Sequence, residues 1–190
     1  MGAFDHIILL LSFVYALAIG HLLTTVALLL RRRREVRFSA LHAFWMLNAL
    51  VAIIANWISF WDLRGLPSWS VWTIFFTFLL AFTNYLYAAL VSPEIRAEGA
   101  VDLVAFQAEH RLEIVGSWFA LAVIALLANV VYGHVFGVIT WGEQNLAVAP
   151  MVISGIVALI WRARWAQISS AVVVAASWAL YFGALQGAIH

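Results

Sequence analysis

Three polar side chains lie deep in long apolar runs of this sequence, where polar residues are rare. His21, Asn48 and Asn84 are each about 12 to 15 Å from one end of their run, counting about 1.5 Å of helix rise per residue. His21 is also an ionisable residue, and ionisable residues inside a membrane are candidates for function. The three residues predict a shared polar layer, although His21 has a structural alternative as a neutral, hydrogen-bonded histidine.

Two tryptophans are candidates for an aromatic wall beside this layer. Trp45 and Trp178 lie deeper in their runs than most of the ten tryptophans, which cluster at run ends as interfacial anchors do. Helical spacing also gathers polar and small residues on one face of each of two runs. These faces are Trp45, Asn48, Ala52, Ala55, Asn56 and Ser59 on one run, and Ser70, Thr73, Thr77, Ala81, Asn84 and Ala88 on the next.

The histidines allow a second chemistry, which is haem ligation by two imidazoles. His6 and His134 are expected near one membrane surface, while His21 and His42 lie in adjacent runs. Four-helix cytochromes usually place two histidines on each of two helices at matching depths, and this regularity is absent. We therefore expect no cofactor, and we keep haem as the alternative that an absorbance spectrum tests.

Residue types that are missing restrict the chemistry further. The chain has no cysteine, which excludes cysteine-ligated iron–sulfur clusters and disulfides, and no lysine, which excludes lysine imines. No Asp, Glu or Arg lies in the middle of any apolar run. Because ion-coupled transporters usually need such a relay, a passive pathway is favoured over coupled transport.

Motifs of membrane enzymes are also missing. No Gly-x-Ser-x motif with a partnering histidine occurs in an apolar run, and Ser154-Gly155 has no such context. No His-Glu-x-x-His metal motif occurs either. We therefore expect neither an enzyme nor a metal site.

The elements that must position these residues are transmembrane helices. Hydrophobic residues make up 66% of the 190 residues and charged ones 10%, with a mean hydropathy of +1.01, which is typical of a membrane protein. At about 20 residues per crossing, the sequence predicts one all-α domain, residues 1–190, with six transmembrane helices. The expected spans are Ile7 to Leu30, Phe38 to Phe60, Ser70 to Val91, Leu112 to Val135, Leu146 to Trp161 and Trp165 to Ala188.

Arginines predict the orientation of these six spans. The first, third and fifth connections contain nine of the ten basic residues, and Arg64 alone lies on the other side. Short loops rich in Arg stay in the cytoplasm, so both termini are expected outside, on the periplasmic or extracellular side. The longest cytoplasmic connection, residues 92–113, is expected to contain an interfacial helix in its second half, because Val101, Val104, Ala108 and Leu112 follow a helical period.

Rows of small residues indicate faces where helices approach closely. Small residues four positions apart let membrane helices pack closely without a hydrophobic driving force. The same rows could instead contact a second copy of the chain. The row of the first span is Ser12, Ala16, Gly20 and Thr24, and that of the sixth is Ala171, Ala175, Ala179, Gly183 and Gly187.

Two parts of the chain resemble known families. The segments Phe4 to His6, Gly20 to Leu22, Arg31 to Arg34, Leu41-His42, Trp45, Asn48 and Trp57 to Trp61 resemble a family of small bacterial inner-membrane proteins without an assigned function. This resemblance implies a bacterial inner membrane. The segment Phe82 to Ala89 is similar to the amide and urea channel family, which implies conduction of small neutral solutes through an aromatic-lined pore in an oligomer.

The sequence therefore favours a multi-pass protein of the bacterial inner membrane that is a passive channel for a small neutral solute or ion. His21, Asn48 and Asn84 would form its polar layer and Trp45 an aromatic wall. The alternatives are a non-catalytic accessory subunit of a larger membrane complex and a haem-binding electron carrier. Membrane lipid and a second copy or another subunit are the expected partners, and no nucleic acid is expected.

Overall fold

A computed structural model describes residues 3–66, 68–95, 99–136 and 141–186. The described chain is almost entirely helical, and its only strands are two residues long. The all-α class is therefore confirmed. The elements are α1 (Ala3–Arg31), β1 (Val36–Arg37), α2 (Ala40–Ser59), the 3-10 helix η1 (Phe60–Gly65), α3 (Val71–Val91), β2 (Val101–Asp102), α4 (Leu103–Glu109), α5 (Arg111–Phe136), α6 (Trp141–Ile160) and α7 (Arg164–Gln186).

Three of the helices begin at a side chain that caps them. The hydroxyls of Ser39 and Ser70 accept hydrogen bonds from the amides of His42 and Thr73, at the starts of α2 and α3. The carboxylate of Asp102 caps α4 in the same way, where a side-chain acceptor satisfies amides that have no partner within the helix. These polar residues end the apolar runs, and they explain why the helix boundaries follow the sequence closely.

Within the described residues, five helices are long and apolar enough to cross a membrane: α1, the α2–η1 segment, α3, α5 and α7. Their length and composition make the protein a helical membrane protein. The sixth expected span corresponds to α6, whose described apolar part, Asn145–Ile160, is shorter than the other five. The structure thus gives five candidate spans and one short apolar helix.

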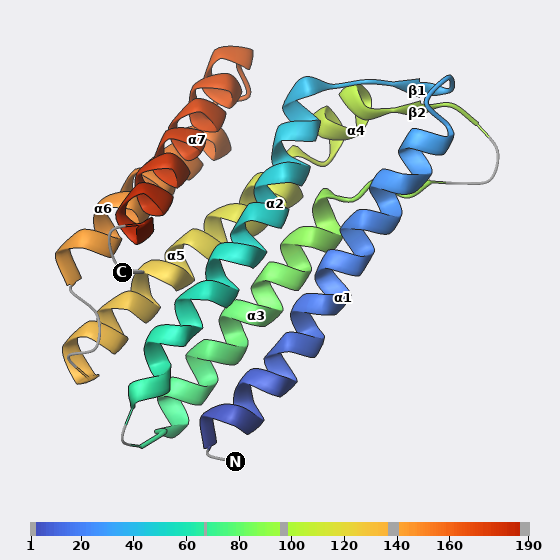
Figure 1. Cartoon of the computed structure of the whole chain (residues 1–190). Coiled ribbons are helices and arrows are strands. Elements are labelled where there is room, and N and C mark those ends of the chain that lie inside the picture. Colours follow the sequence, from blue (N-terminus) through green and yellow to red (C-terminus); the bar gives the residue numbers. More distant parts are fainter. Residues whose placement is uncertain (1–2, 67, 96–98, 137–140, 187–190) are drawn as a thin grey trace.

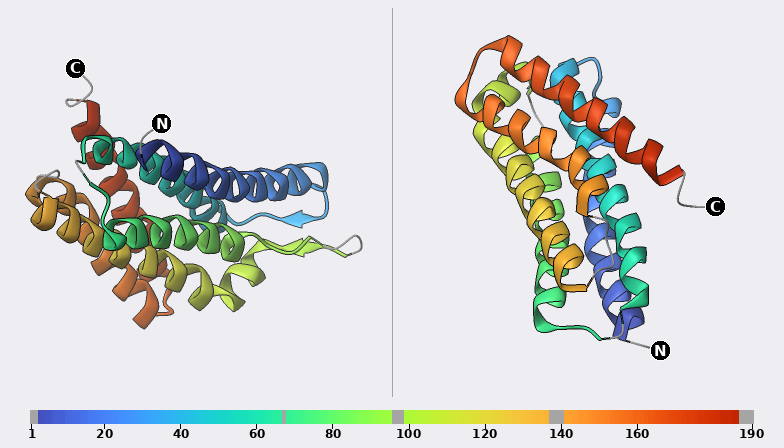
Figure 2. Two further views of the ribbon diagram at one scale, coloured as in Figure 1. Left: turned by 90° about the horizontal axis from the view of Figure 1, so that it is seen from below. Right: turned by 90° about the vertical axis from the view of Figure 1, so that its left-hand side faces the viewer.

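The long helices form two groups, α1, α2 and α3 in the first and α5, α6 and α7 in the second, which lie side by side in Figures 1 and 2. In the first group, α3 packs against both α1 and α2, and in the second, α6 packs against both α5 and α7. The two groups join mainly where α3 packs against α5, and α2 touches α7 over a smaller area. The helix that packs against both others is the last of the first group, α3, but the middle one of the second group, α6. The second group therefore does not repeat the packing of the first.

The described parts of the arginine-rich α1–α2, α3–α5 and α6–α7 connections lie at the upper end of the molecule in Figure 1, whereas the α2–α3 connection, which contains Arg64, lies at the lower end. At the upper end, β1 and β2 pair in parallel, with Val36 opposite Val101, and Arg37 Nη1 lies 3.0 Å from Asp102 Oδ2. The predicted helix of the 92–113 connection is present as α4, and its Leu103 and Gln107 are buried. The paired strands are a feature that the sequence did not predict.

Candidate functional site

A cavity of about 80 Å³ lies between the two groups of helices. Residues of α2, α3, α5, α6 and α7 line it, and most of them are apolar or aromatic. The polar residues among them carry one hydroxyl, two amides, two phenols and two indole N–H groups. A cavity of this size has room for a few water molecules or one small solute. These polar residues are Asn56, Ser59, Trp118, Asn129, Tyr132, Trp178 and Tyr181.

A chain of hydrogen bonds around Asn48 links three helices beside this cavity. The indole N–H of Trp178 on α7 donates to Asn48 Oδ1 of α2 at 2.7 Å, and Asn48 Nδ2 donates to the hydroxyl of Tyr87 on α3 at 2.9 Å. That hydroxyl donates in turn to the backbone carbonyl of Trp45 at 3.0 Å. We call Asn48, Tyr87 and Trp178 the Asn48 network; it joins α7 to the first group of helices.

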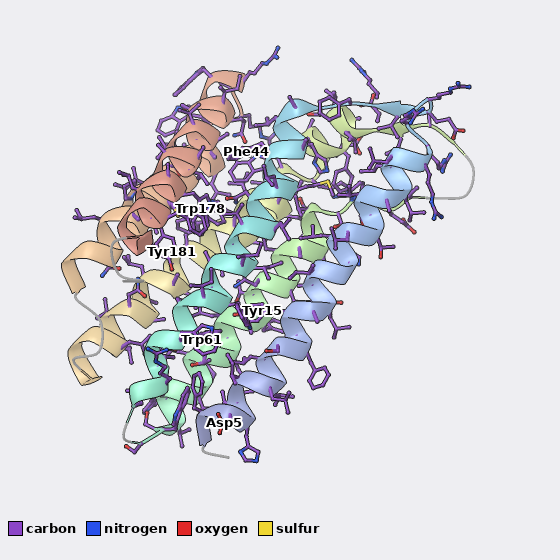
Figure 3. All side chains as sticks on the ribbon, viewed as in Figure 1. Asp5, Tyr15, Phe44, Trp61, Trp178 and Tyr181 are labelled. Carbon is purple, nitrogen blue, oxygen red and sulfur yellow. The ribbon has the colours of Figure 1, made fainter. Side chains whose placement is uncertain are left out.

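Aromatic rings pack around this network. The ring of Trp118, on α5, lies 5.8 Å from that of Tyr87, 6.3 Å from Trp178 and 6.5 Å from Trp45. In Figure 3, Trp178 and Tyr181 lie on the side of α7 that faces α2. The indole N–H groups of Trp45 and Trp118 are buried and find no acceptor among the described residues. The ring of Trp118 also lines the cavity, but its buried N–H is not exposed to that space.

Other polar side chains of the apolar runs tie the helices together. The hydroxyls of Thr77 on α3 and Tyr132 on α5 lie 2.9 Å apart. Asn129 Nδ2 donates to Asn145 Oδ1 at 3.2 Å between α5 and α6. The polar face predicted on α2 does line the cavity, through Asn56 and Ser59. The face predicted on α3 instead contributes buried contacts, since Thr77 bonds to α5.

The predicted polar layer is not formed by the three residues together. Asn48 is buried in the network, and Asn84 is buried with its Nδ2 donating to the carbonyl of Leu80 on its own helix. His21 lies on the exposed face of α1, because the inward face of that helix contains Tyr15, Ala18 and Leu22. One step along a helix turns the side chain by about 100°, so His21 cannot share the face of Leu22.

The other predicted residue, Trp45, is fully buried, with its indole against Trp118. Among the small-residue rows, Ala16, Gly20 and Thr24 on α1 are exposed, as are Ala175, Ala179 and Gly183 on α7. Gly187 lies outside the described residues. The prediction that these rows pack tightly is therefore wrong within this chain for the six exposed residues.

The candidate haem ligands are found in different surroundings. His42 is fully buried, its Nδ1 lies 3.0 Å from Gln107 Oε1 of α4, and its ring meets Phe106 edge-on at 5.3 Å. His6 and His21 are exposed on α1, fifteen residues apart. The side chain of His134 lies outside the described part of the chain. Haem ligation therefore stays a prediction, and a Soret band of the purified protein would establish it.

Two residues of the site were missed by the sequence analysis. Tyr87 supplies the central hydroxyl of the network, and Trp118 supplies the aromatic ring between three others. The available signal was that Trp118 lies seven residues inside α5, too deep for an interfacial anchor. Its neighbours come from other helices, so the sequence alone could not show them.

Comparison with models of known protein families, with curated proteins and with solved structures finds no match.

Proposed function

We propose that this protein is a six-span protein of the bacterial inner membrane that lets a small neutral solute cross passively. In this proposal both termini lie outside, and α6 is the fifth of the six spans. The observation that carries it is the cavity between the two groups of helices, which the Asn48 network borders. The nine arginines of three connections support the orientation, since arginine-rich loops stay in the cytoplasm.

The chemistry of the cavity favours a neutral solute. None of the described residues that line it carries a formal charge. A charged solute would lose its hydration without a counter-charge, which costs far more than the burial of a hydrogen-bonded neutral group. The amides and phenols are suited to a solute that both accepts and donates hydrogen bonds.

The Asn48 network is the expected gate of this pathway. Its hydrogen bonds and the rings of Tyr87 and Trp178, with Trp118 packed against them, would close the space between α2 and α7. Because α2 and α7 share only a small contact area, a small movement of α7 would separate Trp178 from Asn48. The cavity would then extend past the network toward the arginine-rich end.

Solute flux into proteoliposomes tests this proposal. We would compare the swelling rates of vesicles with and without the protein in glycerol, formamide and erythritol. The expected result is faster entry of at least one solute, and a changed rate for Asn48→Ala. His21→Ala is the matched control, because His21 lies on the exposed face of α1, and it should leave the rate unchanged. Equal rates with and without protein for all three solutes would refute the proposal.

An accessory role in a larger membrane complex is the second candidate, and the outer face of α1 favours it. His21 lies about 15 Å from the end of α1 at Arg31, which is near the middle of a hydrocarbon core of about 30 Å. Its side chain is exposed there beside Ala16, Gly20 and Thr24. A polar residue facing lipid at this depth is costly, and a partner helix would cover it.

Disulfide crosslinking separates the two candidates. The chain has no cysteine, so a single Gly20→Cys variant in membranes can form a disulfide only with another molecule. A symmetric crosslink would place a second copy on this face, and a heterologous adduct would place another subunit there. If neither forms while Gly20→Cys still reacts with a small maleimide, the accessory role through this face is excluded.

A further inference from the structure

A second space lies between α1 and α2, near the arginine-rich end. We call it the α1–α2 groove; its volume is about 430 Å³. Apolar side chains form almost all of its surface, and Arg33 is its only charged lining residue among those described. The lining residues are Leu22, Leu23, Val26, Leu29, Leu30, Arg33, Val36, Phe38, Ala43, Met46, Leu47, Leu50 and Leu103.

The groove has the dimensions of one leaflet. Its lining on α1 extends from Leu22 to the turn at Arg33, which is eleven residues or about 16 Å along a helix axis. That length is about half of a hydrocarbon core of about 30 Å. Val36, Phe38 and Leu103 line its inner end, and the exposed side chains of Leu23 and Leu47 lie along its flank. An occupant can therefore enter sideways from the bilayer.

The arginines beside the groove have unequal surroundings. Arg32 Nε donates to Glu35 Oε2 at 3.0 Å, and Arg37 pairs with Asp102. The amide N–H of Ala105 and the nearby Arg37 hold the pKa of Asp102 below its ordinary value, so this carboxylate stays charged. Among the described residues, no carboxylate pairs with Arg31, Arg33 or Arg34. Three cations thus remain at the level where lipid headgroups lie.

We propose that the α1–α2 groove is a binding site for an anionic phospholipid. One acyl chain lies along the groove, and the phosphate pairs with Arg33, with Arg31 and Arg34 close by on the same turn. Basic pockets between membrane helices on the cytoplasmic side are suited to anionic headgroups, and each basic residue near the surface adds to the affinity. This site is separate from the cavity of the proposed pathway, since no residue lines both.

Lipid retention by the purified full-length chain tests the proposal. The protein is reconstituted in bilayers of equal parts phosphatidylglycerol and phosphatidylcholine, then extracted in mild detergent, and its bound lipids are counted by native mass spectrometry. We expect phosphatidylglycerol to be retained in preference to phosphatidylcholine. Arg33→Gln should lower this retention about fivefold, and Arg33→Lys should restore most of it. Arg64→Gln, at the opposite end, is the charge-matched control and should change nothing.

Two further arms separate the acyl chain from the headgroup. Ala43→Trp fills the groove without altering charge, so it should lower retention of the lipid while the arginines remain. Glycerol 3-phosphate, the free headgroup chemistry, should not displace the bound lipid at millimolar concentration. Thermal unfolding of each variant shows whether it is folded, and only variants with the wild-type transition are compared.

Three results would overturn the proposal. Equal retention of the two lipids would show a non-specific annular layer. Wild-type retention in Arg33→Gln would show that the phosphate lies elsewhere. Displacement by glycerol 3-phosphate, or wild-type retention in a folded Ala43→Trp variant, would show that the groove holds no acyl chain.

Discussion

Asn48 shows how one polar residue in an apolar helix can determine which helices meet. Its amide offers donors and an acceptor, and inside a membrane no water satisfies them. Tyr87 and Trp178 satisfy one of each, from two different helices. Trp178 of α7 donates this bond to α2. Because α2 and α7 touch over a small area, the bond is a large part of their interface.

The first prediction concerns that bond. Trp178→Phe keeps an aromatic ring but removes the N–H that donates to Asn48. Hydrogen bonds between membrane helices contribute about 0.6 kcal/mol on average and up to about 1.7 kcal/mol, so we expect a loss of stability in this range. Reversible unfolding in mixed micelles measures it.

Trp165→Phe is the matched control, because Trp165 is exposed and contacts Trp161 only through its ring at 6.3 Å. We expect its stability to equal that of the wild type. An equal loss of stability in both variants would mean that the smaller ring causes the loss and that the hydrogen bond of Trp178 contributes nothing.

At the scale of residues, the sequence indicated which side chains are unusual, but not which side chains they contact. Asn48 and Trp45 stand out in the sequence because a polar group and a large ring are unusual so deep in a span. Their partners Tyr87 and Trp118 are 39 and 73 positions away from them, respectively, and only the packing of helices brings them close. For His21, the depth was predictable but the face was not.

At the scale of the elements, Gly155 of α6 is the one described glycine with atoms of another helix, α5, within 4 Å of where its Cβ would lie. A Cβ placed on Gly155 of α6 would lie 2.9 Å from Cδ2 and 3.3 Å from Cβ of Phe119 on α5. The ring can turn, but the Cβ of Phe119 is fixed by the backbone of its helix. Gly155 therefore allows the two helices to pack at their present distance.

The second prediction follows from this contact. Gly155→Ala should lower the free energy of unfolding by about 1 kcal/mol, since an overpacked site usually costs 1 to 3 kcal/mol and the higher helix propensity of Ala returns about 1 kcal/mol. Unfolding in mixed micelles again gives the number. For Gly116→Ala, where nothing lies within 4 Å of the new Cβ, we expect equal or slightly higher stability. A stabilised Gly155→Ala variant would show that Phe119 yields freely.

Helix positions were predictable because composition determines them, whereas packing faces were not. The apolar runs predicted at Phe38 to Phe60 and Ser70 to Val91 became α2 with η1 and α3, and Ser39 and Ser70 cap the starts of α2 and α3. The small-residue rows failed as guides to contacts within the chain, because an exposed row is equally suited to lipid or a partner. Small residues permit close approach; they do not determine which helix approaches.

At the scale of the whole molecule, the structure separates charge from the apolar interior. Arg111 lies at the start of α5 and donates to the carbonyls of Ala158 and Leu159 at the end of α6. A cation there interacts favourably with the negative end of the helix dipole. Gln167 of α7 also donates to the carbonyl of Ala158, at 2.8 Å, so one cluster ties three helix ends together.

The third prediction concerns the orientation in the membrane. The chain has no cysteine, so a single introduced cysteine is the only thiol of the chain that a maleimide can label. In intact cells, a membrane-impermeant maleimide should label Gly65→Cys, in η1, and should leave Ala163→Cys, between α6 and α7, unlabelled. After permeabilisation both should react. The reverse pattern would place the arginine-rich connections outside, and labelling of both in intact cells would mean that α6 does not cross.

The sequence by itself determined that this is a helical membrane protein and, to within about five residues, where its long helices begin. It did so because hydrophobicity over about 20 residues and the chemistry of capping are local properties. Only the tertiary structure decided that His21 faces outward, that Asn48 meets Tyr87 and Trp178, and that a cavity and a groove lie between helices. Those features depend on how each helix is rotated about its axis, and in an apolar environment that rotation is determined by packing between residues far apart in the chain.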